Sequence, residues 1–380
     1  MTFAAMEFEL RIRAVQGRMA QNDLAALLLT QDADIRYLTG YLTRFWESPT
    51  RPWFLVVPAA GLPIAVIPSI GAALMAQTVV RDIRTWGAPD YGDDGVSLLI
   101  DTLKEVAQGG KIGTPFGIES HLRMPLADWT RLCAELSIGS DHAVLRHARM
   151  IKTPAEVDSI RAACQIAGRA FQRVPEIARA GTPLAEVFRR FQMLCLEEGA
   201  DWVPYLAGGA GPTGYEDVIS PASEVPLQSG DIMMLDTGVI RNGYFSDFDR
   251  NFAVGVPSKA AEAAYETLLK AMQAGECALK AGNTAADVFH AMDQLCTGGK
   301  GGQSAGRLGH GLGLQLTEGL SFIADDHTVL EPGMVITLEP GVSVSGGAGL
   351  MVHEDDYVVT ADGWERLSPM PPEKLVRLEP

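Results

Sequence analysis

Short apolar runs alternate with amphipathic stretches along the first 148 residues. The runs at 24–30, 53–58 and 63–68 are β-rich, whereas 96–107 and 122–136 carry the apolar spacing of surface helices. Residues 59–62 between the second and third runs include a glycine, so the two runs predict a β-hairpin. The pattern is typical of an α/β domain over 1–148.

A helix start marks the expected boundary between two domains. Thr153 is suited to the N-cap, Pro154 to the first helical position and Glu156 to the capping box. Helical periodicity continues through 156–178 and again through 183–198. We therefore expect a second domain over 149–380.

The second domain contains an internal duplication. The segment AGTPLAEVFRRFQMLC at 180–195 aligns without gaps on AGNTAADVFHAMDQLC at 281–296. Each copy is followed by an apolar strand that begins with glycine, GDIMMLD and GMVITLE, and carries an acid six residues later, Asp236 and Glu339. Two similar halves place these strand ends near a pseudo-two-fold axis, where the two carboxylates would meet. The alternative is a pair of unrelated acids at strand ends.

Two more acids follow on strands that fold back. Asn242-Gly243 is a hairpin signal, so Asp247 is expected on the strand beside Asp236, and Glu354 is on a similar return strand after Glu339. A buried carboxylate is costly unless it is paired or bound to a cation. A cation, a shared proton or an arginine would relieve the repulsion between such neighbours.

His310 adds a nitrogen ligand to these acids. It lies in GRLGHGLGL, where small neighbours allow close packing and leave the imidazole accessible. Alone, a histidine is more often structural; in company with four strand acids it predicts a ligand. Such an oxygen-rich site suits Mn²⁺, Fe²⁺, Co²⁺ or Zn²⁺, and four carboxylates balance the charge of two divalent cations.

Composition narrows the class of protein. The chain has 380 residues, 47% of them hydrophobic, and a net charge of −16, which is typical of a globular protein and disfavours nucleic acid as a partner. No apolar run approaches a membrane span and the N-terminus mixes Glu with Arg, so we expect a cytoplasmic protein. The five scattered cysteines predict neither disulfides nor a zinc knuckle.

The residues of the second domain resemble those of the pita-bread metallopeptidases. This family includes methionine aminopeptidase, Xaa-Pro aminopeptidase, prolidase and the metal-free relative creatinase. The match consists of the aspartates of LDTG and FSDFDRNF, the histidine of GHGLG and the glutamates of LEPG and HEDD. It covers about 149–380, and the first domain is similar to the creatinase-type domain that precedes it in prolidases.

The resemblance implies a ligand set and a mechanism. Asp247 and Glu354 would bridge two metal ions, Asp236 would complete one site, and His310 with Glu339 the other. A metal-bridging hydroxide would be the nucleophile, with Glu339 as the general acid and base. Mn²⁺ is the expected metal, with Co, Zn or Fe as alternatives. A homodimer and a short-peptide or other small-molecule substrate are also implied, by family default an Xaa-Pro peptide.

Three positions depart from the family pattern. The peptidases usually carry a histidine about seventeen residues before the first metal aspartate and another seven after the metal histidine; here these positions hold Ile219 and Thr317. Val352 stands where prolidases have an arginine, next to His353. The catalytic residues expected besides Glu339 are therefore His353 and Thr317. Further candidates for the missing hydrogen-bond donors are Tyr215, Glu216 and Glu318.

Other hypotheses follow from these departures. The chain could be a lyase or a non-peptide amide hydrolase acting on an amino-acid-like solute, or a catalytically silent binding module. The segment RFWESPTRPWF at 44–54 has two interpretations as well: a loop over a partner subunit's active site, or a solvated loop packed on its own domain.

Overall fold

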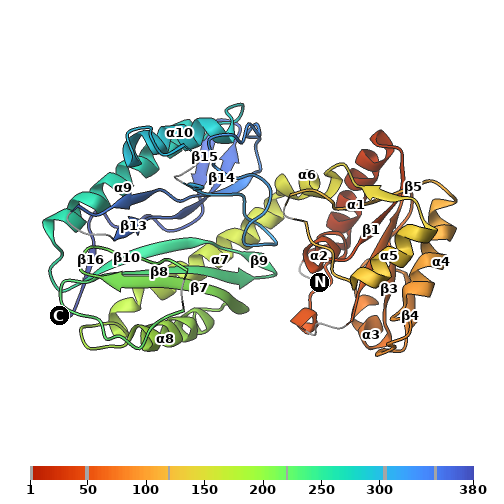
Figure 1. The fold of residues 1–380 in the computed structure, drawn as a ribbon, viewed down its shortest axis with the longest axis horizontal. Helices are drawn as coiled ribbons and strands as arrows, with labels where there is room; N and C mark the ends of the chain where they lie inside the picture. The colour runs from red at the N-terminus through yellow and green to blue at the C-terminus, as the bar shows by residue number, and fades with distance from the viewer. Residues whose placement is uncertain (1–2, 48–50, 119, 220, 303–305, 346–348) are drawn as a thin grey trace. The chain divides into compact units, whose positions relative to one another are not determined.

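The protein, represented by a computed structural model, divides into two compact units, Met1–Arg149 and Met150–Pro380. The structure describes residues 3–47, 51–118, 120–219, 221–302, 306–345 and 349–380 (Figure 1). Each unit combines β-sheets with helices, so the predicted α/β fold class is confirmed. No helix in these ranges is long and apolar enough to cross a membrane.

The first unit contains one mixed sheet. Its strands are β1 (Leu24–Leu29), β2 (Phe54–Pro58), β3 (Ile64–Pro68), β4 (Asp82–Trp86), β5 (Lys111–Thr114) and β6 (Ile138–Ser140). They are ordered β4-β3-β2-β1-β5-β6. Strands β2 and β3 pair antiparallel, with Phe54 opposite Val66, which confirms the hairpin predicted at 59–62.

Helices pack on this sheet because their apolar positions repeat at helical spacing. The helices up to the unit boundary are α1 (Ala5–Gln21), α2 (Asp32–Thr39), α3 (Ala72–Met75), α4 (Val96–Ala107), α5 (Leu126–Glu135) and α6 (Val144–Met150), with short 3₁₀ turns η1 (Phe45–Glu47) and η2 (Ser69–Gly71). Leu99 and Leu103 of α4 pack in one cluster with Val56 and Ile112 of the sheet. Helix α5 begins later than predicted, because Pro125 holds the extended N-cap conformation.

The aromatic residues of 44–54 pack within the first unit. Trp46 and Trp53 both contact Tyr41, with ring centroids 6.5 and 5.6 Å away, and the guanidinium of Arg123 lies 5.0 Å from the Trp46 ring. Residues 48–50 lie outside the described ranges. The hypothesis that this loop covers a partner's site stays a prediction.

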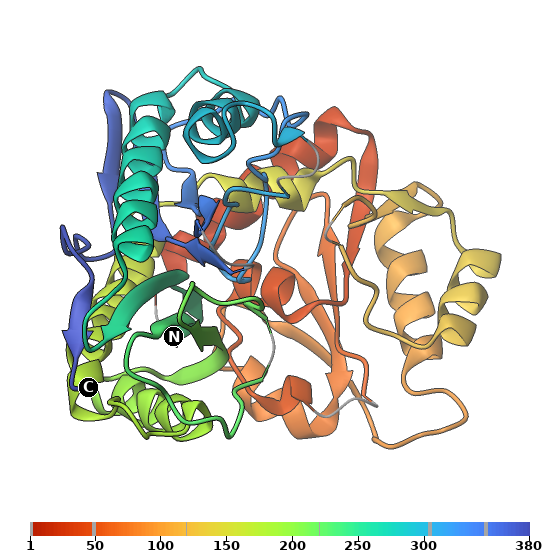
Figure 2. The ribbon, with the colours of Figure 1, turned by 60° about the vertical axis from the view of Figure 1, so that its left-hand side comes forward.

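The second unit is built from two sets of strands between helices. The helices are α7 (Pro154–Gln172), α8 (Leu184–Glu197), α9 (Lys259–Ala278) and α10 (Ala285–Cys296), with the 3₁₀ turn η3 (Val174–Glu176). The strands are β7 (Trp202–Gly211), β8 (Ile232–Arg241), β9 (Tyr244–Phe245), β10 (Phe248–Val254), β11 (Val335–Leu338), β12 (Gly341–Ser343), β13 (Leu350–Val352), β14 (Asp355–Thr360), β15 (Gly363–Arg366) and β16 (Val376–Leu378). Helices α9 and α10 lie on one side of the strands and α8 on the other (Figures 1 and 2).

The strands pair in three groups. One sheet has the order β16-β10-β8-β7, with β9 paired to β8; a second has the order β11-β14-β15; and β12 pairs with β13. The predicted capping box of α7 is present, since the Thr153 side chain accepts from the Glu156 amide and the Glu156 side chain from the Thr153 amide.

The two halves repeat the same backbone hydrogen bonds. Matching pairs are Gly181 N to Leu227 O and Gly282 N to Leu330 O, Leu184 N to Val225 O and Ala285 N to Thr328 O, and Gly230 N to Val254 O and Gly333 N to Val359 O. Each pair ties the start of α8 or α10, or the strand glycine, to its own half. The predicted duplication is therefore a structural repeat.

Candidate metal centre

The first two acids are brought together by a hairpin. Asn242 and Gly243 have φ of 56° and 84°, as a two-residue turn with both central residues at positive φ requires, and Arg241 pairs with Tyr244 across it. The residue directly opposite Asp236 is Asp249. Asp247 comes two residues earlier, directly before β10 begins at Phe248, and not on the strand itself as expected. The register thus places Asp247 diagonal to Asp236 and adds a third acid.

The second pair of acids arises in the same way in the other half. Strands β11 and β14 pair antiparallel with Leu338 opposite Asp355. Glu339 follows Leu338 directly and Glu354 directly precedes Asp355, so the two glutamates lie at one end of this strand pair. The duplication therefore supplies two acids from each half.

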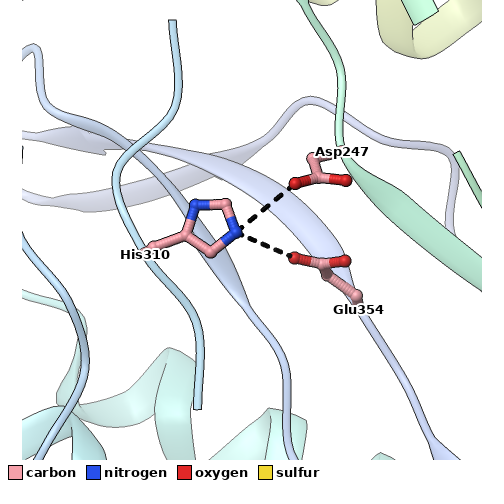
Figure 3. Close-up of side chains that lie close together, drawn as sticks. All are labelled: Asp247, His310 and Glu354. Atoms are coloured by element: carbon pink, nitrogen blue, oxygen red, sulfur yellow. Dashed lines mark ion pairs between the residues drawn. The ribbon is translucent and has the colours of Figure 1, made fainter. Parts of the chain in front are cut away.

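Asp247, His310 and Glu354 converge on one point. The Nε2 atom of His310 lies 3.3 Å from Oδ2 of Asp247 and 3.8 Å from Oε1 of Glu354. One potential ligand atom from each residue lies within 4.8 Å of the others, and all three residues are buried. Figure 3 shows the imidazole edge directed at both carboxylates.

The backbone around His310 fixes the direction of its ring. Its amide donates to Thr337 Oγ1 (3.2 Å), its carbonyl accepts from the Thr337 amide (2.7 Å), and Nδ1 lies 3.0 Å from the Gly311 carbonyl. Nε2 is therefore the nitrogen left for a ligand. Gly309 has φ of 124°, and a Cβ there would lie 2.2 Å from the Thr337 carbonyl, so glycine permits this close approach.

Asp236 and Glu339 lie around this triad. Asp236 accepts a hydrogen bond from Tyr205 Oη at 2.9 Å, and Tyr205 comes from β7. The charges of Asp236 and Glu339 both raise the pKa of Asp247 and of Glu354. Four carboxylates from the two halves therefore act on one another electrostatically.

Burial and mutual repulsion shift the titration of these acids. Burial, followed by the charge of Asp249, raises the pKa of Asp236 to about 7. Burial and Asp236 raise that of Glu339 to about 8, and those of Asp247 and Glu354 also lie well above their usual range. Burial lowers the pKa of His310 to about 4, so the ring is neutral at pH 7 and can act as a ligand.

The donor set fits divalent cations. Asp236 Oδ1, Asp247 Oδ1 and Glu354 Oε1 are buried and have no hydrogen-bond partner among the described residues. Buried carboxylate oxygens without donors are expensive, and a cation satisfies them directly. Three such oxygens beside a neutral imidazole form the mixed oxygen and nitrogen set that Mn²⁺, Fe²⁺, Co²⁺ and Zn²⁺ accept.

The other catalytic candidates lie differently. His353 is fully buried, with Nδ1 3.5 Å from Asp249 and Nε2 3.2 Å from Asp355. Burial lowers its pKa, but Asp249 and Asp355 outweigh that and the net shift is upward. The ring offers no exposed surface in this structure, and a catalytic role for His353 stays a prediction.

Thr317 and Ile219, which stand where the peptidases carry histidines, differ in their surroundings. Thr317 is half-buried in the bends before Glu318, whose carboxylate lies 3.0 Å from Lys152 Nζ, and no hydrogen bond joins Thr317 to the triad within the described ranges. Ile219 is 81% exposed. Ile219 has no polar side-chain atom, and the Thr317 hydroxyl can donate a hydrogen bond but carries no charge.

Tyr205, Asp249 and Arg307 were missed in the sequence. Asp249 had a signal, since it stands two residues after Asp247 in the sequence SDFD, the spacing at which side chains of an extended chain point to the same side. Tyr205 had none, because a tyrosine in a strand is ordinary. Arg307 is exposed, and its charge lowers the pKa of Asp247, Glu339 and His310; its only signal was its place three residues before His310.

This fold and site define a class, the two-domain metallopeptidases with a duplicated catalytic unit. The profile of metallopeptidase family M24 matches residues 158–361, and that of the creatinase/prolidase N-terminal domain matches 11–151. The chain belongs to metallopeptidase family M24, and it is an enzyme of the metal-dependent hydrolase class.

Particular relatives match nearly all of the chain or a large part of it. The probable dipeptidase PepE of Mycobacterium tuberculosis is 31% identical over 380 residues, which is 98% of both chains. The Xaa-Pro dipeptidase of Pyrococcus furiosus is 33% identical over 232 residues, 59% of this chain and 65% of its own. The crystal structure of dipeptidase PepE from Mycobacterium ulcerans superposes with a TM-score of 0.84 at 29% identity, covering 99% of each chain.

Proposed function

We propose that this metallopeptidase is a dinuclear dipeptidase that hydrolyses the amide bond of a short peptide, with Xaa-Pro dipeptides as first substrates. The observation that carries the proposal is the buried convergence of Asp247, His310 and Glu354, with Asp236 and Glu339 coupled to them. The names of the relatives, dipeptidase and Xaa-Pro dipeptidase, support the substrate class.

The ligand assignment is the one that the resemblance to the family implies. Asp236, Asp247, His310, Glu339 and Glu354 would hold two cations, with Asp247 and Glu354 shared between them, and the approach of both acids to His310 supports this set. Mn²⁺ is the metal we propose, with Co, Zn or Fe as alternatives. When bound, the cations lower the pKa of water and polarise the scissile carbonyl.

Glu339 is the group proposed to move the proton. Its carboxyl is half-buried, and in the cation-free protein burial and Asp236 raise its pKa to about 8. Next to bound cations, the ionised carboxylate could accept a proton from water and return it to the leaving amine. Tyr205 would hold Asp236 in place through its 2.9 Å hydrogen bond.

Arg307 is proposed to receive the carboxylate at the C-terminus of a dipeptide. The carbonyl of the next residue, Leu308, accepts from the Glu339 amide at 2.9 Å, so the arginine begins a segment tied to the site. Its side chain is exposed, and a guanidinium binds a carboxylate through two parallel hydrogen bonds. This would supply the cation that Val352 does not.

A second candidate function is hydrolysis or lyase chemistry on a small amino-acid-like solute. It is favoured by Ile219, an exposed apolar side chain where the peptidases carry a histidine that binds substrate. The loss of one oxyanion donor costs about 3–4 kcal/mol in other enzymes.

A cytoplasmic location and a homodimer stay predictions.

The test is a substrate panel on metal-free protein reloaded with Mn²⁺. Xaa-Pro dipeptides, other dipeptides and amino-acid-like amides are compared at equal loading, with Asp247→Ala and the exposed control Asp158→Ala, 76% exposed. Cleavage of dipeptides by the wild type and by Asp158→Ala, but not by Asp247→Ala, supports the proposal. Metal binding with turnover of the amides alone would transfer the assignment to the second function.

A further inference from the structure

A second cluster of buried charges adjoins the ligand residues. His353 directly precedes Glu354, and its two ring nitrogens face two carboxylates, Asp249 Oδ1 at 3.5 Å and Asp355 Oδ2 at 3.2 Å. All three of these side chains are at most 1% exposed. Nε2 is within hydrogen-bond distance of Asp355, whereas Nδ1 faces Asp249 at ion-pair distance without a hydrogen bond among the described residues.

The two carboxylates belong to different halves of the duplication. Asp249 lies on β10, directly opposite Asp236 on β8. Asp355 begins β14 and lies opposite Leu338, the residue before Glu339. The imidazole of His353 therefore connects the half that carries Asp236 to the half that carries the two glutamates.

Asp355, one of the two carboxylates that His353 faces, is fixed by several hydrogen bonds. Asp355 accepts from Arg250 Nη2 at 2.8 Å, from Ser368 Oγ at 2.6 Å and from Arg366 Nη1 at 2.5 Å. Arg250 also donates to the Glu354 carbonyl at 3.2 Å. Asp355 is thus a fixed anchor, and its position also fixes the backbone of the ligand Glu354.

Asp249, the other carboxylate, is contacted by His353. Neither oxygen of Asp249 has a hydrogen-bond partner within the described ranges, and His353 Nδ1 lies 3.5 Å from its Oδ1. Asp249 lies directly opposite Asp236 on the neighbouring strand, where like charges repel one another. The His353 ring lies between Asp249 on β10 and Asp355 at the start of β14, so it connects the two strands.

We propose that His353 is a positioning residue that ties Asp249 to Asp355 and so sets the spacing between the ligands of the two halves. The inference rests on the proposed metal centre, because it concerns how that centre is held. His353 does not touch substrate; Tyr265 covers its ring edge-on at 6.1 Å. In other metal sites the loss of such an outer partner costs about 10–100-fold in metal affinity.

The experiment measures Mn²⁺ affinity of the full chain by calorimetry, with KM and kcat at saturating metal as further readouts. The variants are His353→Gln, Asp249→Asn and their double mutant. His290→Gln, at an exposed histidine of the same unit, is the matched control. Val187→Ala, a fully buried position on α8, controls for a general loss of stability.

We expect each single variant to weaken Mn²⁺ binding by about 10-fold or more and the double mutant to add little, because both remove one contact. KM at saturating metal should stay within about twofold of the wild type, as no substrate contact is lost. Both controls should bind Mn²⁺ like the wild type, although Val187→Ala unfolds at a lower temperature.

Other outcomes would overturn the inference. Unchanged Mn²⁺ affinity with a lower melting temperature, as in Val187→Ala, would make His353 merely structural. A raised KM with unchanged affinity would make it a substrate contact. If the wild type binds Mn²⁺ but cleaves no peptide, the proposed function fails while the positioning role is still decided by affinity; if it binds none, both fail.

Discussion

Several carboxyl groups in and next to the site have a pKa far above the usual carboxyl value. Burial is the first cause, and it raises the pKa of Glu339 to about 8, that of Asp236 to about 7, and that of Asp356, which accepts from the Asp247 amide, to about 8. In an unfolded chain the same groups have a pKa of about 4. The cation-free folded protein therefore binds more protons than the unfolded chain between these values.

This difference predicts a pH-dependent stability. The contribution of these groups is complete below about pH 4 and is lost as the pH rises through the folded values of about 7 to 8. The melting temperature of metal-free protein should fall from pH 5 to pH 8.5, and Mn²⁺ should reverse the fall by binding the deprotonated acids. A metal-free melting temperature that rises over this range contradicts the assignment. Asp236→Asn with Glu339→Gln should flatten the slope.

The proposed contact of Arg307 with the substrate carboxylate predicts an effect on KM. Arg307→Gln should raise KM for a dipeptide with a free C-terminal carboxylate by about 10-fold or more, since a charge-assisted contact contributes about 1.5–3 kcal/mol. The corresponding dipeptide amide, which has no carboxylate, should show little change. Equal effects on both substrates would show that Arg307 acts on the ligands and not on the substrate.

For single residues, the sequence predicted a site residue where a charged side chain stands in an apolar segment. Asp236 stands out in IMMLD, because a carboxylate is rare on an apolar strand. The contact of Tyr205 with Asp236 could not be predicted, because it depends on the pairing of β7 with β8 across 31 positions. The burial of His353 was likewise invisible, because it depends on Asp249 and Asp355 from two different strands.

Among the elements, the segment before His310 carries Gly309, a glycine with positive φ, directly before a proposed ligand. Gly309→Ala would place a Cβ 2.2 Å from the Thr337 carbonyl at φ of 124°. We expect the segment to move, His310 to leave Asp247 and Glu354, and Mn²⁺ affinity to fall by about 10-fold or more. Calorimetric titration with Mn²⁺ measures the effect.

Gly282→Ala is the matched control for this element. Gly282 also has a positive φ, 94°, but a Cβ there meets nothing within 4 Å. It should destabilise the protein by about 1 kcal/mol through backbone strain alone and leave Mn²⁺ affinity unchanged. Equal losses of affinity in the two variants would show that close packing on Thr337 does not position His310.

Helices and the hairpin were predictable to within a few residues because their signals are local. The helix expected over 156–178 ends at Gln172 and passes into a 3₁₀ turn that contains Pro175. Strand register was less accessible, because it is set by pairing between distant segments. This is why Asp249, and not Asp247, proved to be the direct partner of Asp236.

For the whole molecule, the duplication explains how a metal site can form between two halves. Each half repeats the same backbone hydrogen bonds at the start of its helix and strand. Each also supplies two of the four acids, and the one histidine comes from the segment paired with Thr337. The symmetry was predictable because the repeated helix sequence survives, whereas the ties between the halves, such as His353, have no repeated counterpart.

The most direct test of the central claim is the stoichiometry of Mn²⁺ binding, measured by calorimetry on metal-free wild type and on Asp247→Ala. We predict two ions per chain for the wild type and weakened binding of both in the variant, because Asp247 is proposed to bridge them. One ion per chain, bound equally by both proteins, would contradict a dinuclear centre bridged by Asp247. No binding by the wild type would contradict the metal centre itself.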